Sequence, residues 1–488
     1  MEISDHKTIF RLQIDMPSSI DPVFASDTIC REIIDNVYEK LFNFIGNNCV
    51  PVLVEKWWVE SEKIYYFVLK KNIYFHDGLE CDSFAVKESL VRMLNQSNKA
   101  RALFRDLLKH NKIICIDKYL LRIELEYSYL DLIYLLAIQE SSIINPQLLK
   151  KSDLLIKNAS GTGPFIIMSI DNYKKEIILK RFEKYWGNKP DVNYIKIISE
   201  SDYEKRKQLF LKIGDIMAVQ ASKIKEFKID KNIRIDLFDA LDMVLFLFNT
   251  KRKPLSINEF RLALLMSFDY TTFLKYGRMG MGTRINTAIP KGVYSHNSKI
   301  PYINYNIYKA KQIISDIYLP NSTNLKILSV LGMEDADIAC NNLKRGLDIL
   351  GIQSEIHRLP FTQFCIEFDL GNFDISFLSY APDTNNPYSF AYDFYHKNGD
   401  IASVIGFSNN KINSLIDQVR FEKDSIKKYN IYAEIQSIAA TENVYMWLYQ
   451  GQNLKVYKKH LINVSHNILD GDYYFKDIIK LEGTNYDQ

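Results

Sequence analysis

Residues 64–94 read IYYFVLKKNIYFHDGLECDSFAVKESLVRML and predict a strand, a turn and a helix in immediate succession. Residues 64–69 are mostly aromatic and β-branched, which is the composition of a strand. The His-Asp-Gly triplet at 76–78 is typical of a tight turn. Residues 82–94 place apolar side chains at helical spacing, and Asp82 and Ser83 supply an N-cap for that helix.

Working outward, strands and helices continue to alternate along the chain. Towards the N-terminus we expect a strand at 8–15 and a helix at 25–42; towards the C-terminus, the Gly-Thr-Gly-Pro turn at 161–164 precedes a hairpin of 165–169 with 176–181. Further strands are predicted at 242–249, 325–331, 373–379 and 444–449, and further helices at 130–138, 257–273, 308–317, 338–350, 410–419 and 427–439. Such a mixture predicts lobes of the α/β or α+β class.

Length and charge limit the possible functions. A chain of 488 residues corresponds to roughly two to four domains. The 62 basic and 59 acidic residues nearly balance, with a net charge of +3. That balance removes the electrostatic argument for a nucleic-acid partner, and we expect none.

Neither a membrane span nor a secretory signal is visible in the sequence. No apolar run approaches the ~18 residues of a transmembrane helix. The first ten residues, MEISDHKTIF, lack the basic start and apolar core of a signal peptide. Two interpretations are open: a cytoplasmic protein, or a mature form whose signal or lipid anchor was removed.

The motifs of common enzymes and metal proteins are missing from the sequence. The six cysteines form no C-x-x-C pair, and the eight histidines form no H-E-x-x-H motif. No G-x-S-x-G elbow or phosphate-binding loop occurs, and the glycines of residues 277–282 follow a predicted helix instead of a strand. We therefore expect no enzyme, no cofactor and no metal site.

Four separated segments resemble the family 5 extracellular solute-binding proteins, which are receptors for peptides, nickel complexes and similar ligands of ABC importers. These segments share their order and spacing with the family and cover nearly the whole chain: 65–78 with the helix after it, 160–187 (SGTGPFIIMSIDNYKKEIILKRFEKYWG), 248–269, and 377–387 (FLSYAPDTNNP).

The resemblance implies an α/β fold like that of type II periplasmic binding proteins, with two lobes joined by a hinge. We expect residues 1–45, 160–240 and 460–488 in lobe I, residues 46–159 in an extra subdomain of lobe I, and residues 241–459 in lobe II. The implied function is to enclose an oligopeptide between the lobes and deliver it to an ABC permease. We expect a monomer that is located in the periplasm or, as a lipoprotein, on the cell surface. A cytoplasmic location is the less favoured alternative.

The resemblance places the ligand-binding residues mainly in the loop that follows residues 373–379. It implies that Asp383 binds the α-amino group of a peptide. Tyr380 stands where the family usually has tryptophan, and Asn386 replaces the second aspartate of the family pattern. The pocket is therefore expected to be less acidic than in dipeptide receptors.

Three further residues are predicted to contact the ligand. Phe24 would line the cavity, while Arg284 and Arg358 are candidates for holding a peptide C-terminus. We expect a structural role for His76, and for Arg261 that of a structural ion-pair partner.

Two alternative functions stay open. A receptor for nickel, a metallophore or another small solute is one, although Gln139 and Glu140 stand where the nickel-binding branch has an arginine. The other is a cytoplasmic ligand sensor that uses the same fold.

Overall fold

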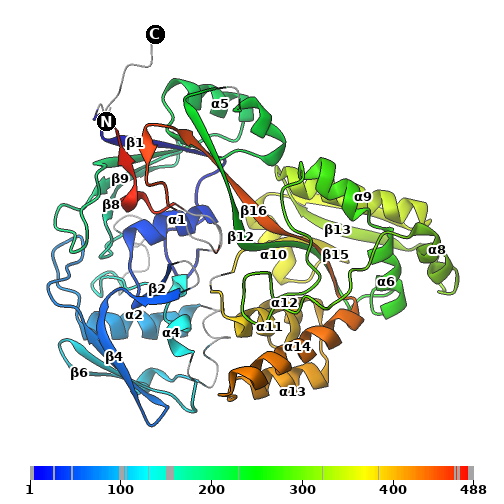
Figure 1. Ribbon diagram of the computed structural model, residues 1–488, viewed down its shortest axis with the longest axis horizontal. Helices are drawn as coiled ribbons and strands as arrows, with labels where there is room; N and C mark the ends of the chain where they lie inside the picture. Colours follow the sequence, from blue (N-terminus) through cyan, green and yellow to red (C-terminus); the bar gives the residue numbers. More distant parts are fainter. Residues whose placement is uncertain are drawn as a thin grey trace. The chain divides into compact units, whose positions relative to one another are not determined.

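The structure is a computed structural model in which the chain forms two compact units (Figure 1). It describes residues 5–25, 28–45, 48–97, 104, 107–129, 131–149, 159–228, 230–320, 322–382, 384–465, 469 and 473–481. Unit 1 consists of residues 1–219, 223–238 and 453–488, and unit 2 of residues 220–222 and 239–452. Two of the crossings between the units lie inside the long strands β12 (Ile233–Phe248) and β16 (Tyr445–Lys458).

Unit 1 is built on a mixed sheet with the strand order β16-β11-β1-β10-β9-β8. Strand β1 pairs in parallel with β10 and β11, whereas β9 is antiparallel to both β8 and β10. The β8–β9 pair confirms the predicted hairpin. Helix α1 contacts β8, and helix α5 contacts β1 and β11. The elements of this layer are β1 (Thr8–Gln13), α1 (Thr28–Val37), β8 (Phe165–Asp171), β9 (Glu176–Arg181), β10 (Tyr194–Ser199), α5 (Tyr203–Lys212) and β11 (Ile216–Met217).

A second, antiparallel sheet of unit 1 has the order β4-β5-β7-β6 and is contacted by helix α2. The Asp82 carboxylate caps α2 by accepting from the Ala85 N–H at 2.9 Å, as the sequence predicts. The remaining elements of unit 1 are β2 (Phe42–Ile45), β3 (Asn48–Pro51), β4 (Val54–Glu60), β5 (Ile64–Leu69), α2 (Ser83–Gln96), η1 (His110–Lys112), β6 (Ile113–Asp117), β7 (Leu120–Glu124), α4 (Leu132–Leu135), η2 (Gln139–Ser141), β17 (Leu461–Ile462), η5 (Phe475–Asp477) and β18 (Ile479–Lys480). The prediction that residues 46–159 form a subdomain of their own stays a prediction.

The two glycine-containing turns of unit 1 interlock. The His76 ring donates from Nε2 to the Gly163 carbonyl at 3.0 Å and accepts at Nδ1 from the Gly161 N–H at 3.4 Å. Burial lowers the pKa of His76 to about 4, which keeps the ring neutral. Gly78 adopts a φ of +92°, but Gly161 is required for another reason: a Cβ there would lie 2.1 Å from the Val37 carbonyl oxygen.

A buried carboxylate joins the same turn to the end of the β8–β9 hairpin segment. Glu39 accepts hydrogen bonds from Thr162 Oγ1 at 2.8 Å, Tyr185 Oη at 2.8 Å and Trp186 Nε1 at 2.7 Å. Burial raises the pKa of Glu39, and the three donors act in the opposite direction. Thr162, which was predicted only as part of a turn, and the Tyr185-Trp186 pair after the hairpin therefore bind the same carboxylate.

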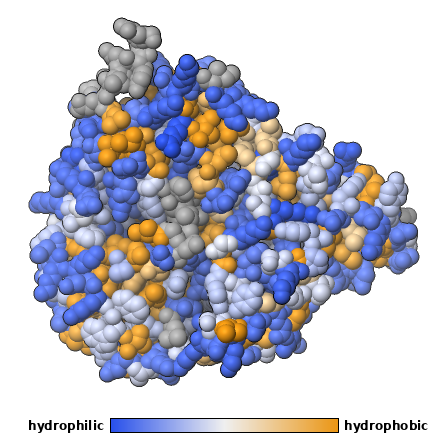
Figure 2. Space-filling view, in the orientation of Figure 1, coloured by the Kyte–Doolittle hydropathy of each residue, from blue (hydrophilic) through white to orange (hydrophobic). Residues whose placement is uncertain are grey.

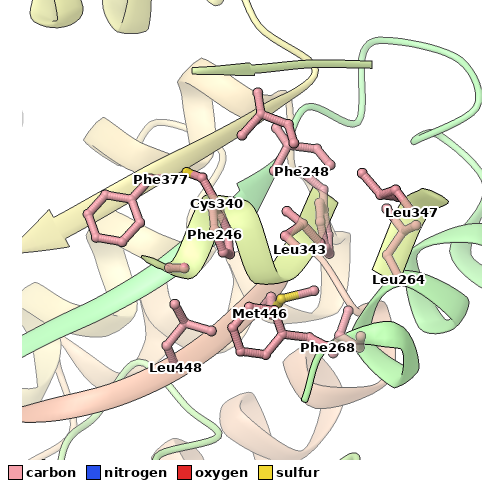
Figure 3. Packing of buried hydrophobic residues seen from close by; sticks show 14 of the residues in the cluster. Phe246, Phe248, Leu264, Phe268, Cys340, Leu343, Leu347, Phe377, Met446 and Leu448 are labelled. Carbon is pink, nitrogen blue, oxygen red and sulfur yellow. The ribbon is translucent and has the colours of Figure 1, made fainter. Parts of the chain in front are cut away.

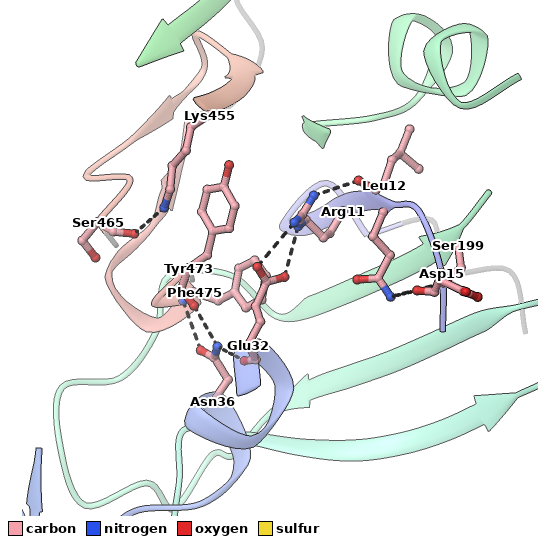
Figure 4. A network of polar contacts seen from close by, with 11 residues as sticks. Arg11, Leu12, Asp15, Glu32, Asn36, Ser199, Lys455, Ser465, Tyr473 and Phe475 are labelled. Carbon is pink, nitrogen blue, oxygen red and sulfur yellow. Dashed lines mark hydrogen bonds and ion pairs between the residues drawn. The ribbon is translucent and has the colours of Figure 1, made fainter. Parts of the chain in front are cut away.

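The C-terminal segment is anchored on α1 (Figure 4). The Asn36 side chain donates to the Tyr473 carbonyl at 2.9 Å and accepts from the Phe475 N–H at 3.1 Å. Arg11 of β1 pairs with Glu32 of α1 at 3.1 Å. The first strand, the first helix and the last described residues thus belong to one polar network.

Unit 2 contains the sheet β14-β13-β15-β12-β16. Strand β13 pairs in parallel with β14 and β15, and β12 is antiparallel to β15. Its elements are η3 (Ala221–Glu226, shared with unit 1), α6 (Asn258–Ser267), α7 (Tyr270–Thr272), the π-turn η4 (Phe273–Gly277), α8 (Ile307–Ser315), β13 (Asn324–Val330), α9 (Glu334–Ile349), β14 (Gln353–Leu359), α10 (Phe361–Asp369), β15 (Ile375–Tyr380), α11 (Pro387–Tyr395), α12 (Asp400–Ile405), α13 (Asn410–Val419) and α14 (Ser425–Glu442).

The core of unit 2 lies between its central strands and helices α6 and α9 (Figure 3). Phe246 and Phe248 of β12 and Leu343 of α9 are fully buried there. Val244, Phe246 and Phe248, alternate residues of β12, face this core because successive side chains of a strand point to opposite faces. The residues between them are buried as well, as expected for a strand that is covered on both sides.

The predicted helix at 257–273 is interrupted. Helix α6 ends at Ser267, Phe268 is extended, and Asp269 starts α7 as an N-cap that accepts from the Thr272 N–H at 3.0 Å. The prediction of one continuous helix was wrong because the capping aspartate lies inside the apolar pattern. Two other helices end earlier than predicted. The helix predicted at 25–42 corresponds to α1, which ends at Val37, and the helix predicted at 130–138 corresponds to α4, which ends at Leu135.

Replacing Gly161 by alanine should destabilise the protein much more than the same change at Gly78. Gly78 has a positive φ with open space around its Cβ position, so Gly78→Ala should cost about 1 kcal/mol of unfolding free energy. Gly161→Ala pushes a methyl group into the Val37 backbone and should cost at least about 3 kcal/mol. Urea unfolding measures both, and equal losses would contradict the close-approach explanation.

The neutral His76 should make stability depend on pH between its folded and unfolded pKa. Since the folded pKa is about 4 and the reference value is 6.5, the unfolded chain binds an extra proton as the pH falls through this window. This contribution is fully present above pH 6.5, and up to about 3 kcal/mol is lost by pH 4. Urea unfolding of the parent protein and of His76→Gln across this range should differ in slope; parallel curves would refute a neutral buried ring.

Candidate functional site

The loop between β15 and α11 is fixed on its C-terminal side by local hydrogen bonds. Asn386 caps α11, because its side-chain oxygen accepts from the Tyr388 N–H at 2.9 Å, and Pro387 occupies the first turn. Thr384, which is 2% exposed, accepts from the Asn386 N–H through its hydroxyl at 3.0 Å. A loop held in this way on a rigid strand and helix is a suitable place for binding groups.

Tyr380 fixes the other side of the loop. Its hydroxyl donates to Asp393 Oδ2 at 2.8 Å, and its ring packs edge-on against Phe394 with centroids 4.9 Å apart. Asp393 is only 3% exposed, so the tyrosine supplies a hydrogen bond to a buried carboxylate. The rings beneath it form a block of packed aromatics from α11 and β16: Phe390, Phe394, Tyr395, Tyr445 and Trp447.

The sequence predicts three ligand-binding residues in or beside this loop, and the structure describes two of them. Asp383 lies outside the described residues, so its contact with a ligand stays a prediction. Tyr380 and Asn386 flank the loop as expected, but both have structural partners that the sequence analysis missed. The Asn386-Pro387 pair was the available signal, since it is typical of a helix N-terminus.

Phe24 belongs to unit 1 and is 58% exposed. Its ring lies 5.7 Å from the Arg92 guanidinium, which binds Asp21 with two hydrogen bonds of 2.9 and 2.5 Å. The Gln139 side chain donates to the carbonyls of Pro22 and Ala25, both at 3.1 Å. Phe24 is therefore an exposed aromatic residue on a firmly held loop.

The two predicted arginines are in unlike environments within unit 2. Arg358 of β14 forms an ion pair with Asp337 of α9, with Nε and Oδ1 2.5 Å apart. Arg284 lies between the rings of Tyr270 and Tyr302, with its guanidinium carbon 4.0 and 4.9 Å from their centroids. The side chains that hold these two arginines, Asp337, Tyr270 and Tyr302, come from segments outside the Tyr380 loop.

Arg261 has the structural role that the sequence predicts, although its partners are carbonyls. It donates from Nη1 to the Leu255 carbonyl at 2.7 Å and from Nε and Nη2 to the Glu442 carbonyl at 3.1 and 2.6 Å. The cation therefore ties the first turn of α6 to the end of α14.

The described residues were also compared with the requirements of metal sites, membrane spans and disulfides. Within these ranges, no three His, Cys, Asp or Glu side chains are placed to hold a metal ion, and no helix is both long and apolar enough to cross a membrane. The six cysteines, all of them among the described residues, form no disulfide. On the face drawn in Figure 2, apolar residues lie in several groups among polar ones, so colour alone singles out no site there among the described residues.

Comparison with known proteins supplies the family context. The model of the bacterial extracellular solute-binding proteins, family 5, matches residues 48–401. The probable D,D-dipeptide-binding periplasmic protein DdpA of Escherichia coli K12 is 25% identical over 455 residues, covering 89% of this chain and 86% of DdpA.

Two solved structures illustrate the fold. DppA from Helicobacter pylori, in complex with the peptide STSA, has a TM-score of 0.89 at 19% identity, covering 97% of this chain and 98% of DppA. AgaA from A. tumefaciens R10, in complex with agropinic acid, has a TM-score of 0.88 at 22% identity, covering 99% of this chain and 100% of AgaA. These similarities confirm the predicted α/β fold of the type II periplasmic binding proteins.

Tyr380→Phe should lower the free energy of unfolding by about 1–2 kcal/mol, because it removes a hydrogen bond to the buried Asp393 while keeping the ring. Tyr318→Phe is the matched control, since Tyr318 is 88% exposed in the same unit. Urea unfolding measures both variants. A loss no larger at Tyr380 than at Tyr318 would show that the hydroxyl does not hold the loop.

Proposed function

This chain belongs to the bacterial extracellular solute-binding proteins of family 5, and on that premise we propose that it binds an oligopeptide and delivers it to the membrane permease of an ABC importer. The family match over residues 48–401 carries the proposal. The ligand class is supported by the similarity to the D,D-dipeptide-binding protein DdpA and to a receptor that holds the peptide STSA.

The charges of the loop after β15 suit the amino end of a peptide. Of its two family carboxylate positions, Asp383 keeps the charge and Asn386 does not. The amide of Asn386 is also engaged as a helix cap, and the nearby Asp393 is buried beneath Tyr380. One carboxylate at these two positions is what a single α-amino group requires, and such a charge-assisted hydrogen bond contributes about 1.5–3 kcal/mol.

The same proposal includes a location outside the cytoplasmic membrane and binding without catalysis. DdpA is described as periplasmic, which supports a site of action outside the cytoplasmic membrane for this chain as well. A family of receptors supports binding without turnover. The protein would act as a monomer that encloses its peptide, and the peptide would stabilise the enclosed state by its higher affinity for it.

The similarity to AgaA favours a second candidate, a receptor for a small organic solute, because that protein holds agropinic acid. Native mass spectrometry of the purified protein, followed by denaturation and identification of the released ligand, separates the two. A mixture of short peptides supports the oligopeptide proposal. One defined small molecule overturns it and establishes the second candidate.

Asp383→Ala should weaken binding of a peptide identified in this way by at least tenfold, about 1.4 kcal/mol. N-acetylation of the peptide removes the positive charge and should cause the same loss in the parent protein but none in the variant. Isothermal titration calorimetry measures the four combinations, with Asp348→Ala, an exposed carboxylate on α9, as the control. Unchanged affinity in Asp383→Ala would exclude Asp383 as the amine anchor.

A further inference from the structure

A cavity of about 260 Å³ lies inside unit 2. Its walls come from residues 284–303, the end of α14 and the start of β16, together with Leu265, Tyr270 and Tyr395. Tyr395, Tyr445 and Trp447 form an apolar wall and are 2, 4 and 8% exposed. The volume is comparable to that of a small organic molecule and lies slightly below the range of drug-sized pockets, ~300–1,000 Å³.

All the charge on the lining of this cavity is positive. Arg284 and Lys299 both line it, and no aspartate or glutamate is among its described lining residues. Lys299 is exposed, so it stands on the solvent side, while Arg284 is half-buried. The aromatic wall has no negative charge to offset either cation.

Arg284 is held in place entirely by neutral groups. Its Nη1 donates to Asn304 Oδ1 at 2.9 Å, and its Nη2 donates to the Ile303 carbonyl. Its Nε is buried without a hydrogen-bond partner, and no described carboxylate acts on its charge. Burial lowers the pKa of the Arg284 guanidinium, with only the two neighbouring tyrosines acting in the other direction.

The negative end of helix α14 does not supply the missing counter-charge. The Thr441 carbonyl accepts from the Asn258 side chain at 2.9 Å, and the Glu442 carbonyl accepts from Arg261. These last carbonyls of the helix already have donors. A half-buried guanidinium without an anion carries an uncompensated desolvation cost, which a bound anion would offset.

We propose that this cavity binds an organic carboxylate, with the carboxylate on Arg284 and the apolar body against Tyr445 and Trp447. A guanidinium presents its donors in a planar fork that matches a carboxylate, and aromatic side chains suit an apolar body. Lys299 at the exposed side adds attraction for an anion approaching from solvent.

The carboxylate has two conceivable sources: a free small acid or the C-terminus of a bound peptide. Only the second rests on the proposed function. The first needs no peptide, because every lining residue of the cavity belongs to unit 2.

Benzoate and its neutral analogue benzamide test the proposal directly. Trp447 lines the cavity, so benzoate should change the intrinsic fluorescence, and this change should disappear in Trp447→Phe. Calorimetry should show benzoate binding at least tenfold more tightly than benzamide. Arg284→Gln should abolish that preference, whereas Arg358→Gln, which removes an arginine already paired with Asp337, should preserve it.

A second variant covers the case in which Arg284→Gln fails to fold. Ala440→Leu fills the cavity from α14 without touching the hydrogen bonds of Arg284, and it should weaken benzoate at least tenfold. The proposal is overturned if benzoate shows no saturable binding by about 10 mM, if benzamide binds equally well, or if both variants bind as the parent does.

Competition then identifies the source of the carboxylate. A peptide with a free C-terminus that displaces benzoate, while its C-terminally amidated form does not, assigns the cavity to the peptide. Undiminished benzoate binding in the presence of saturating peptide assigns it to a free acid. Failure of the peptide proposal alone would leave benzoate binding intact, so the two failures are distinguishable.

Discussion

Unit 1 depends on the buried carboxylate of Glu39, whose hydrogen-bond donors all lie more than a hundred residues away from it along the chain. Thr162, Tyr185 and Trp186 all donate to it. A buried acid without such donors would be strongly unfavourable, so the three contacts must form together with the fold. They hold residues 161–163 directly against the backbone of Val37, where even a methyl group would not fit. Strand β8 begins at Phe165, immediately after this turn, so the carboxylate also fixes where the hairpin meets helix α1. The neutral ring of His76 closes the arrangement without adding a charge to the interior.

Elements whose signals are local were predictable from the sequence. The β8–β9 hairpin and the capped helix α2 each follow from a few neighbouring residues. The same local rules, applied more strictly, would have located the break at Asp269 and the start of α11 at Asn386, because both side chains cap the helix that follows. The reason for Gly161 could not be predicted in this way. A tight turn suggests a special φ, whereas the constraint is the approach of a backbone far away in sequence.

The candidate site was only partly predictable for the same reason. Sequence resemblance selects the loop after β15 and, separately, Arg358 on β14. The contacts that define these side chains come from other elements: Asp393 of α11 for Tyr380, and Asp337 of α9 for Arg358. In the sequence, Arg284 and Arg358 are equivalent candidates for a carboxylate. In the structure one is ion-paired and the other is enclosed by aromatic rings and neutral acceptors. Charge pairing is a property of the folded chain, and composition alone does not reveal it.

This difference between the arginines bears on how a receptor gains affinity. A ligand shifts a conformational equilibrium only through interactions that are stronger in one state than in the other. Arg358 would have to give up Asp337 to bind a ligand carboxylate, so the exchange of one carboxylate for another would contribute little net free energy. Arg284 has no carboxylate to release, and it is already oriented by Tyr270 and by the Ile303 and Asn304 oxygens. A carboxylate bound there adds an interaction without removing one, and little side-chain entropy is lost because the guanidinium is held beforehand. The fold thus keeps one cation satisfied for stability and leaves another available for a ligand.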